Sequence, residues 1–354
     1  MTGTPQPVPP EPPEPAGTPW PGVSVVMPVR NEERHLRTAV AQVLSQDYPG
    51  RLELVVAVAP SRDRTQQIAE ELVAEDARVR LVENPAGIAP TGLNAAIRAT
   101  TYEVVVRVDG HGILSPGYIR RAVELLAETG ADNVGGVMAA EGEPGFEEAA
   151  ARAYVSPIGL GGARFHSGGE AGEVDSVYLG VFRRETLERL GGFDDTFVRA
   201  QDWELNHRIR QAGGTVWFSP ELRVTYHPRS RLSDLVRQFY LTGKWRRAIG
   251  RTHPGTFNYR YLAPPLAVLG CGLGLVLGLA GLVAGLPWLL LGFVLPVGYL
   301  LAVLAASLVE GRGMSLRGRA WLPVVVATMH MTWGAGFLVS PRSLGRRTPQ
   351  PTKV

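Results

Sequence analysis

The chain has 354 residues, 45% of them apolar, which is enough to bury the core of one large or two ordinary domains. A single cysteine, Cys271, excludes an intrachain disulfide framework and a CxxC metal site. The net charge of +3 divides into −11 over residues 1–222, +8 over 223–260 and +6 over 310–354. Because the positive charge flanks an apolar region, a membrane surface is the expected partner, and nucleic acid is not expected.

Residues 1–22 contain nine of the 28 prolines and no apolar run. This composition predicts a disordered, extended leader and not a signal peptide. We therefore expect the bulk of the protein to remain in the cytosol, with an ordered domain over residues 23–230.

After the leader, short β-branched runs alternate with helical patterns, which predicts an α/β sheet with crossover helices. The expected strands are 23–29, 52–58, 79–83 and 103–108. The expected helices begin near Asn31, Asp63, Ala89 and Ser115. Because the strands are apolar throughout, helices are expected on both faces of the sheet.

Open α/β sheets bind ligands at the carboxyl ends of their strands, here in the loops that follow Val29, Val58 and Val108. "PVRNEE" after the first strand contains no GxGxxG, and GxxxxGK[ST] occurs nowhere, so dinucleotide and P-loop sites are not expected. The fourth strand instead ends in Asp109-Gly110-His111. A carboxylate and an imidazole can hold a divalent metal ion that also binds the oxygens of a nucleotide diphosphate, although Asp-Gly is common in turns as well.

Basic and apolar residues recur at helical spacing in "RLSDLVRQFYLTGKWRRAIGR", within residues 231–260. The pattern predicts a basic amphipathic helix that lies in the membrane interface. A surface helix packed on the N-terminal domain has the same pattern, and the two interpretations are compatible.

Residues 261–309 form a run of 49 without a charged residue. Its length predicts two membrane spans, 262–286 and 288–309, with a buried helical bundle as the alternative. The arginines that follow place the N-terminal domain on the cytosolic side of the cell membrane, in a multi-pass protein. A third apolar segment, 320–341, either crosses the membrane or is re-entrant or interfacial, and a basic tail follows at 342–354.

Several of these motifs, taken in order, resemble the family 2 glycosyltransferases over about residues 23–250. "VSVVMPVRNEERHL" is similar to that family's first strand and Pro-x-x-Asn-Glu loop, and "RVDGH" stands where the family has its metal-binding Asp-x-Asp. "GGFDDTFVRAQDWELNHRIRQAGG" is similar to the segment with the family's Glu-Asp pair. Within the family, "NPAGIAPTGLNAAIRAT" and "VDSVYLGVFRRETLERLGGFD" are most similar to membrane-bound glucosyltransferases of succinoglycan-type exopolysaccharide assembly.

The resemblance implies a nucleotide-sugar-binding, Rossmann-like GT-A domain followed by transmembrane helices. Asp202 would be the catalytic base, although it could also be a first-turn carboxylate that stabilises its helix. Asp109 and His111 would hold Mg²⁺ or Mn²⁺ as the cofactor. The expected donor nucleotide-binding residues are Pro28, Val29, Arg30, Asn31, Glu32, Asp63, Asn94, Arg107 and Asp109. The expected acceptor or pocket residues are Tyr178, Arg183, Gln201, His227, Gln238 and Trp245.

Three departures from the family pattern bear on the substrate. Val58, Ala59 and Pro60 replace the usual carboxylates after the second strand, which argues against UDP as the donor nucleotide. Gln201 replaces the glutamate of the Glu-Asp pair and removes a charge that would raise the pKa of the base. "QFYLTGKWRR" does not match the Gln-x-x-Arg-Trp signature of processive synthases, which favours the transfer of single sugars.

The sequence therefore predicts a metal-dependent, inverting hexosyltransferase anchored in the membrane. Its donor would be a nucleotide sugar, and its acceptor would be a lipid-linked glycan, or another acceptor near the membrane, in cell-envelope or exopolysaccharide synthesis. An inverting transfer needs one general base and no covalent nucleophile, which matches a single aspartate. The alternatives are a processive polysaccharide synthase and a catalytically silent, membrane-bound nucleotide-sugar binder.

Overall fold

The computed structural model of the chain describes residues 20–160, 162–254, 256 and 259–345. The predicted disordered leader lies outside the described residues up to residue 19, and the predicted basic tail lies outside them from residue 346. We call residues 20–226 the head.

The head is built on one nine-stranded sheet with the order β3-β2-β1-β4-β8-β6-β9-β5, and β7 pairs with β9. The strands are β1 (Val23–Val29), β2 (Leu52–Val58), β3 (Val79–Glu83), β4 (Val104–Arg107), β5 (Ile113–Leu114), β6 (Asn133–Ala140), β7 (Gly172–Glu173), β8 (Tyr178–Arg183) and β9 (Val216–Tyr226). The first four confirm the predicted strands and pair in parallel, so their carboxyl ends meet at one edge. β8 joins β4 in the antiparallel direction and makes the sheet mixed.

Eight helices surround this sheet among the described residues of the head. They are α1 (Leu36–Leu44), α2 (Thr65–Glu75), α3 (Ala89–Ala99), α4 (Tyr118–Thr129), α5 (Phe146–Val155), α6 (Arg164–Ser167), α7 (Arg184–Leu190) and α8 (Gln201–Gln211). The prediction that a helix begins near Asn31 was wrong by five residues. Asn31 has a φ of 56°, a left-handed conformation that does not start a right-handed helix.

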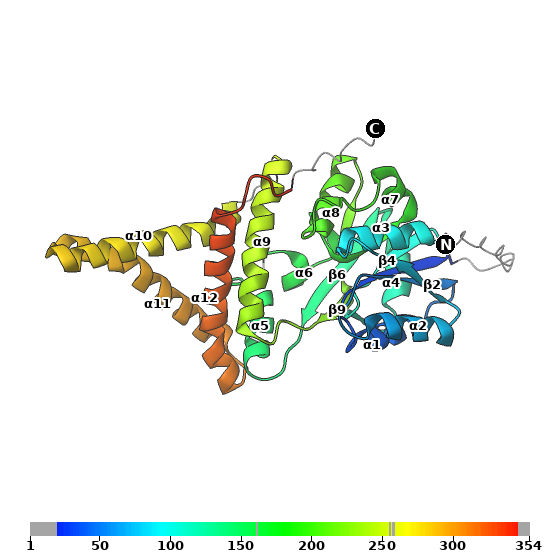
Figure 1. Cartoon of the computed structure of the whole chain (residues 1–354), viewed down its shortest axis with the longest axis horizontal. Helices are drawn as coiled ribbons and strands as arrows, with labels where there is room; N and C mark the ends of the chain where they lie inside the picture. Colours follow the sequence, from blue (N-terminus) through cyan, green and yellow to red (C-terminus); the bar gives the residue numbers. More distant parts are fainter. Residues whose placement is uncertain (1–19, 161, 255, 257–258, 346–354) are drawn as a thin grey trace.

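Both faces of the sheet are covered, as predicted (Figure 1). Val25 and Met27 point into a core with α1, α2 and α4, whereas Val26 between them points into a second core with α3, α7 and α8. This alternation follows from the period of two along a strand. The parallel strands are therefore buried from both sides, and ligands reach them only at their ends.

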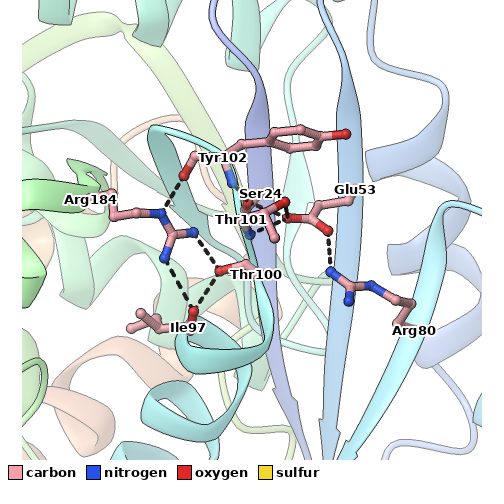
Figure 2. Close-up of polar contacts among 8 residues, drawn as sticks. All are labelled: Ser24, Glu53, Arg80, Ile97, Thr100, Thr101, Tyr102 and Arg184. Carbon is pink, nitrogen blue, oxygen red and sulfur yellow. Dashed lines mark hydrogen bonds and ion pairs between the residues drawn. The ribbon is translucent and has the colours of Figure 1, made fainter. Parts of the chain in front are cut away.

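A buried polar network closes the amino-terminal end of the parallel strands (Figure 2). Glu53 on β2 accepts hydrogen bonds from Ser24 Oγ at 2.6 Å and from the backbone N–H of Thr101 at 2.9 Å, and it pairs with Arg80. Arg184 donates to carbonyl oxygens at the end of α3 and in the loop after it. Each buried polar group has a partner, so this end is structural.

The prediction that Arg183 lies in the ligand pocket was wrong. β8 runs antiparallel to β4, which pairs Arg183 with Val104 at the start of β4. The Arg183 guanidinium donates to the carbonyl oxygens of Ala131 at 2.9 Å and Leu126 at 2.5 Å. It therefore secures the end of α4, at the edge of the sheet opposite to Asp109.

The C-terminal part consists of helices, and α10 and α11 project away from the head (Figure 1). The elements are α9 (Leu232–Thr252), the 3₁₀ helix η1 (Tyr259–Leu262), α10 (Ala263–Ala284), the 3₁₀ helix η2 (Pro287–Phe293), α11 (Val294–Glu310) and α12 (Leu316–Leu338). Within the part of the chain that the structure describes, three segments are long and apolar enough to cross a membrane: 259–284, 287–310 and 316–338. They correspond to the three predicted apolar segments.

α12 differs from the other two segments because 44% of its most apolar window is buried, against 17% and 11%. It lies beside α9 along its length (Figure 1). At their contact, a Cβ on Gly243 would come within 2.0 Å of the Trp333 carbonyl oxygen, and a Cβ on Gly336 within 2.0 Å of that of Tyr240. Glycine at both positions is what allows the two backbones to approach so closely.

Polar contacts also attach both ends of α12. At its start, Ser315 donates to Glu148 of α5 from its backbone N–H at 3.0 Å and from its hydroxyl at 2.5 Å. At its end, Arg247 of α9 donates to the carbonyl oxygens of Phe337 at 3.0 Å and Leu338 at 2.7 Å. An arginine at these carbonyls satisfies acceptors left open by the last helical turn and complements the helix dipole.

Candidate functional site

The loops after β1 and β2 are joined at the carboxyl edge of the sheet. The Asn31 N–H donates to Ser61 Oγ at 3.1 Å, and the Asn31 side-chain oxygen accepts from the Arg62 N–H at 2.8 Å. The Glu32 N–H donates to Thr65 Oγ1 at 2.7 Å. The left-handed φ of Asn31 is held by these bonds, as is common for strained residues at binding sites.

Asp63 has a structural position in this pair of loops. Its carboxylate accepts from the Thr65 N–H and hydroxyl at 3.1 and 2.6 Å and from the Glu33 N–H at 3.2 Å. It therefore forms a turn directly before α2 and fixes the loop after β1 to the loop after β2. Arg30 extends the connection to the loop after β3 through a 3.1 Å bond to the Gly87 carbonyl.

Arg107 links the two carboxylates that the sequence nominated for catalysis and metal binding. Its guanidinium is 5% exposed and donates to Asp109 Oδ1 at 3.0 Å through Nη2. Through Nη1 it pairs with Asp202 Oδ1. One buried cation at the end of β4 thus holds the loop after β4 and the first turn of α8 together.

The charges in this group shift one another's proton affinities. Burial raises the pKa of Asp202, Arg107 opposes the rise, and Asp109 adds to it, with the pKa above its usual value as the result. The Asp202 side chain remains 26% exposed, so a substrate can reach it. A carboxylate with a raised pKa is a stronger base than an ordinary aspartate.

The loop before Asp202 is held in place by Asn94 on α3. The Asn94 side chain donates to the Phe193 carbonyl at 2.7 Å and accepts from the Phe193 N–H at 2.9 Å. Ala200, the residue before α8, has a φ of 59°. Asn94 therefore orders the loop that leads to α8.

His111, in the loop after β4, is paired with Glu32, in the loop after β1, with Nδ1 2.8 Å from Glu32 Oε1. This hydrogen bond raises the pKa of His111, against an opposing effect of burial. Imidazoles that bind metals commonly donate their other N–H to a carboxylate in this way. Asp109, His111 and the supporting Glu32 therefore suit a divalent ion. The described residues contain no group of three protein ligands, so such an ion would need oxygens from a substrate.

Tyr178 lies beside the linked carboxylates. Burial raises its pKa well above the usual value, and Asp109 and Asp202 add to the rise. The next residue, Leu179, has a φ of 49°, and the pairing of β8 with β6 is irregular here. The pairing of β6 with β9 is irregular at the same place, and Gly136 allows it, because a Cβ there would lie 1.8 Å from the Leu222 carbonyl oxygen of β9.

Three of the four remaining predicted acceptor or pocket residues lie next to Asp202 or at the end of β9, and the fourth does not. Gln201 is the first residue of α8, next to Asp202, and exposed His227 follows β9. Gln238 on α9 donates to the Tyr226 hydroxyl at 3.3 Å. The assignment of Trp245 to the pocket was wrong: it is buried in a small core against Phe197, with a ring distance of 6.2 Å.

Five residues near this site were not predicted from the sequence: Tyr154, Arg199, Tyr226, Arg229 and Arg237. Arg199 interacts electrostatically with the other four. They come from α5, the loop before α8, the end of β9 and α9. The charge distribution could have indicated Arg229 and Arg237, because the segment with net positive charge begins directly after Leu222 and includes the first turns of α9.

Comparisons with known proteins give consistent results. The model of glycosyl transferase family 2 matches residues 24–191. Over 319 residues the chain is 30% identical to the succinoglycan biosynthesis protein ExoA of Rhizobium meliloti (strain 1021), covering 88% of this chain and 93% of that protein. It is 22% identical over 251 residues to a dolichyl N-acetyl-alpha-D-glucosaminyl phosphate 3-beta-D-2,3-diacetamido-2,3-dideoxy-beta-D-glucuronosyltransferase of Methanococcus voltae, covering 68% and 77%.

Among solved structures, the mannosyltransferase PcManGT from Pyrobaculum calidifontis, in complex with GDP-Man and Mn²⁺, has a similar fold. The TM-score is 0.55 with 20% sequence identity, and the match covers 91% of this chain and 87% of that one.

Proposed function

The chain belongs to glycosyl transferase family 2, and on that basis we propose that it is a membrane-anchored, inverting hexosyltransferase with a lipid-linked or other membrane-proximal acceptor. Its donor is a nucleotide sugar, which the joined loops after β1 and β2 bind. Its glycan belongs to cell-envelope or exopolysaccharide synthesis. The name of ExoA, a succinoglycan biosynthesis protein, supports this assignment.

The observation that carries the proposal is the single guanidinium of Arg107 between Asp109 and Asp202. In the reaction, an acceptor hydroxyl attacks the anomeric carbon while the bond from that carbon to the diphosphate breaks. Asp202 takes the hydroxyl proton, and its raised pKa suits it to this task. Arg107 keeps the base at a constant position relative to Asp109, on the side where the leaving diphosphate would lie.

Asp109 and His111 are the residues that would hold a divalent metal ion. When bound, the ion would offset the negative charge that develops on the leaving diphosphate. Glu32 orients the imidazole through the 2.8 Å contact. The complex of PcManGT with GDP-Man and Mn²⁺ supports this choice of cofactor and donor class.

Glu32→Gln is expected to weaken Mn²⁺ binding by roughly 10- to 100-fold, because the imidazole loses its orienting carboxylate. Binding of Mn²⁺ in the presence of a nucleotide diphosphate, followed by electron paramagnetic resonance, measures this without turnover. Glu33→Gln, a change at the exposed neighbouring carboxylate, is the matched control and should leave the affinity unchanged. Equal weakening in both variants would show a disturbed loop and no specific role for Glu32.

The packing of the C-terminal helices supports a particular membrane arrangement. In this proposal α10 and α11 cross the bilayer as a hairpin, and α12 lies against the cytosolic head. The contacts of Ser315 with Glu148 and of Arg247 with the last turn of α12 support this arrangement. α12 and the basic helix α9 would then bring lipid-linked acceptors to the carboxyl edge of the sheet.

An accessibility experiment separates this arrangement from three crossings. In a Cys271→Ser background, Arg342→Cys is expected to react with an impermeant maleimide from the same side as Asp195→Cys in the head. Ala284→Cys, at the tip of the hairpin, should react only from the other side. Labelling of Arg342→Cys and Ala284→Cys from one common side would reject the interfacial position of α12.

The function itself is tested by release of nucleotide diphosphate from UDP-, GDP- and dTDP-sugars by the detergent-solubilised protein. Each donor is tested with and without membrane lipid extract, and with Mn²⁺ or EDTA. Release that needs both extract and metal is the expected result and identifies the donor. Donor binding without turnover across the panel would favour a silent nucleotide-sugar binder instead.

A further inference from the structure

A row of three tyrosines leads from the catalytic carboxylates toward α9. Tyr178, beside Asp109 and Asp202, has its ring centroid 6.4 Å from that of Tyr226. The Tyr226 centroid is in turn 5.5 Å from that of Tyr154. We call these residues the tyrosine row. Aromatic rings with polar tips commonly line sites for polar ligands such as sugars.

Three arginines stand at the far end of this row: Arg199, Arg229 and Arg237. We call them the arginine cluster. Gln238, next to Arg237 on α9, donates to the Tyr226 hydroxyl at 3.3 Å, which brings the first turns of α9 against the end of β9, three residues before Arg229. Arg199 lies three residues before Asp202 in the loop that leads into α8. In agreement with this placement, burial lowers the pKa of Arg199, and repulsion from Arg229 and Arg237 lowers it further. None of their side chains has a hydrogen bond or carboxylate partner among the residues that the structure describes. Arg199 is half-buried, whereas Arg229 and Arg237 are exposed. Elsewhere in the head, the partly buried Arg208 is paired with a carboxylate, which Arg199 is not.

Buried polar atoms without partners lie at the same place. The Tyr154 hydroxyl is inaccessible to solvent and makes no hydrogen bond of normal geometry, although Tyr226 and Gln238 lie close enough to shift its pKa. The Gln238 side-chain oxygen is also unpartnered. Leaving a buried hydroxyl unsatisfied costs free energy, so such an atom marks a place where a ligand group or water completes the bonding.

Unpaired arginines with neighbouring hydroxyl and amide groups suit a phosphate group, because guanidinium ions bind phosphate oxygens through paired hydrogen bonds. We propose that the arginine cluster binds the phosphate or diphosphate that joins the acceptor sugar to its lipid, with that sugar lying beside Tyr178 and Tyr226, the two partly exposed members of the tyrosine row. This inference rests on the proposed function, since it places the acceptor hydroxyl at Asp202. It adds an acceptor-side anion site to the donor site.

The position of the cluster favours the acceptor over the donor diphosphate. The donor loops and the Glu32–His111 pair lie at the ends of β1, β2 and β4. Arg237 is on α9, and Arg229 is in the segment that leads into it. The cluster therefore lies on the side of Asp202 from which a lipid-linked molecule would enter.

Two triple variants with the same change of net charge test the proposal. The cluster variant is R199Q/R229Q/R237Q. The control is R231Q/R312Q/R317Q, which removes three exposed arginines near the membrane side but outside the cluster. Equilibrium binding to the full-length protein in detergent is measured with three probes: farnesyl diphosphate, inorganic diphosphate, and GDP or UDP with Mn²⁺.

The cluster variant is expected to bind farnesyl diphosphate roughly tenfold more weakly or worse, as the loss of charge-assisted hydrogen bonds predicts. Inorganic diphosphate should compete for the same site but bind more weakly than the lipid form. The control variant should keep its affinity for all three probes. In the cluster variant, the affinity for the nucleotide diphosphate should stay unchanged.

Other outcomes would overturn the proposal. Equal weakening in both variants would indicate general attraction of anionic lipid by the basic surface. An equal loss of nucleotide diphosphate binding would assign the cluster to the donor, and unchanged binding of farnesyl diphosphate would reject the site. These measurements need no turnover, so failure of the cluster can be distinguished from failure of the transferase assignment.

Discussion

Asp202→Asn is expected to lower the rate of sugar transfer by about 10²- to 10⁴-fold, the usual contribution of a general base. The amide keeps the shape of the carboxylate and can still approach Arg107, but it does not accept the acceptor proton. Nucleotide binding should remain, because Asp202 lies outside the joined loops after β1 and β2. Nucleotide diphosphate release and donor binding are measured side by side to separate the two effects.

The control for this variant is Asp195→Asn, which changes an exposed carboxylate on the same loop. It should leave the rate unchanged. A second readout is the pH profile of kcat/KM in the wild-type protein. The base works in its ionised form, so the rate falls as the pH drops through the raised pKa of Asp202. The midpoint of this acid limb should lie above the usual aspartate range, and Asp202→Asn should abolish it. A normal rate in Asp202→Asn would exclude it as the base.

Arg107→Met is expected to reduce the free energy of unfolding by about 3–5 kcal/mol, the cost of removing one partner from a buried ion pair. The substitution leaves the Asp109 and Asp202 carboxylates close together without the cation that links them. Loss of activity should accompany the loss of stability, because the base is no longer held. Denaturant unfolding of the protein in detergent measures the change.

Arg80→Met provides a matched comparison at the other end of the sheet. Arg80 is 41% exposed, and its partner Glu53 keeps hydrogen bonds from Ser24 and Thr101 when the arginine is removed (Figure 2). The expected loss is therefore about 0–1 kcal/mol. The double variant Arg107→Met/Asp202→Asn should recover part of the stability lost in Arg107→Met. Equal losses in Arg107→Met and Arg80→Met would contradict the linking role of Arg107.

The parallel half of the sheet was predictable because its strands are β-branched and apolar throughout. Val104 and its neighbours on β4 could be recognised without knowledge of their partners. The half beyond β4, in which parallel and antiparallel pairs are mixed, was not predictable, since β6 contains Gly135 and Gly136, which break the strand pattern and serve the irregular pairings with β8 and β9. The pattern of the sequence alone therefore predicted the strands of only half of the sheet in the GT-A-like head.

The candidate site was likewise predictable only in part. Asp109 and Asp202 could be nominated separately from their motifs, but their common partner Arg107 depends on a contact between residues 95 positions apart. Arg183 was misplaced because the direction of β8 decides which end of the sheet it reaches. Pairing direction is a tertiary property that local sequence does not determine.

The hydrophobic core around Tyr154 is shared between the first and last parts of the chain. Met138 and Tyr154 of the head lie in one cluster with Phe239 of α9 and with Met329 and Trp333 of α12. During synthesis the head emerges first, while the helix that completes this core is made last, after the α10–α11 hairpin. The core around Tyr154 is thus complete only after the hairpin and α12 have been made. A chain whose synthesis stops before α12 would have the joined loops after β1 and β2 but an unfinished core beside Tyr178 and Tyr226.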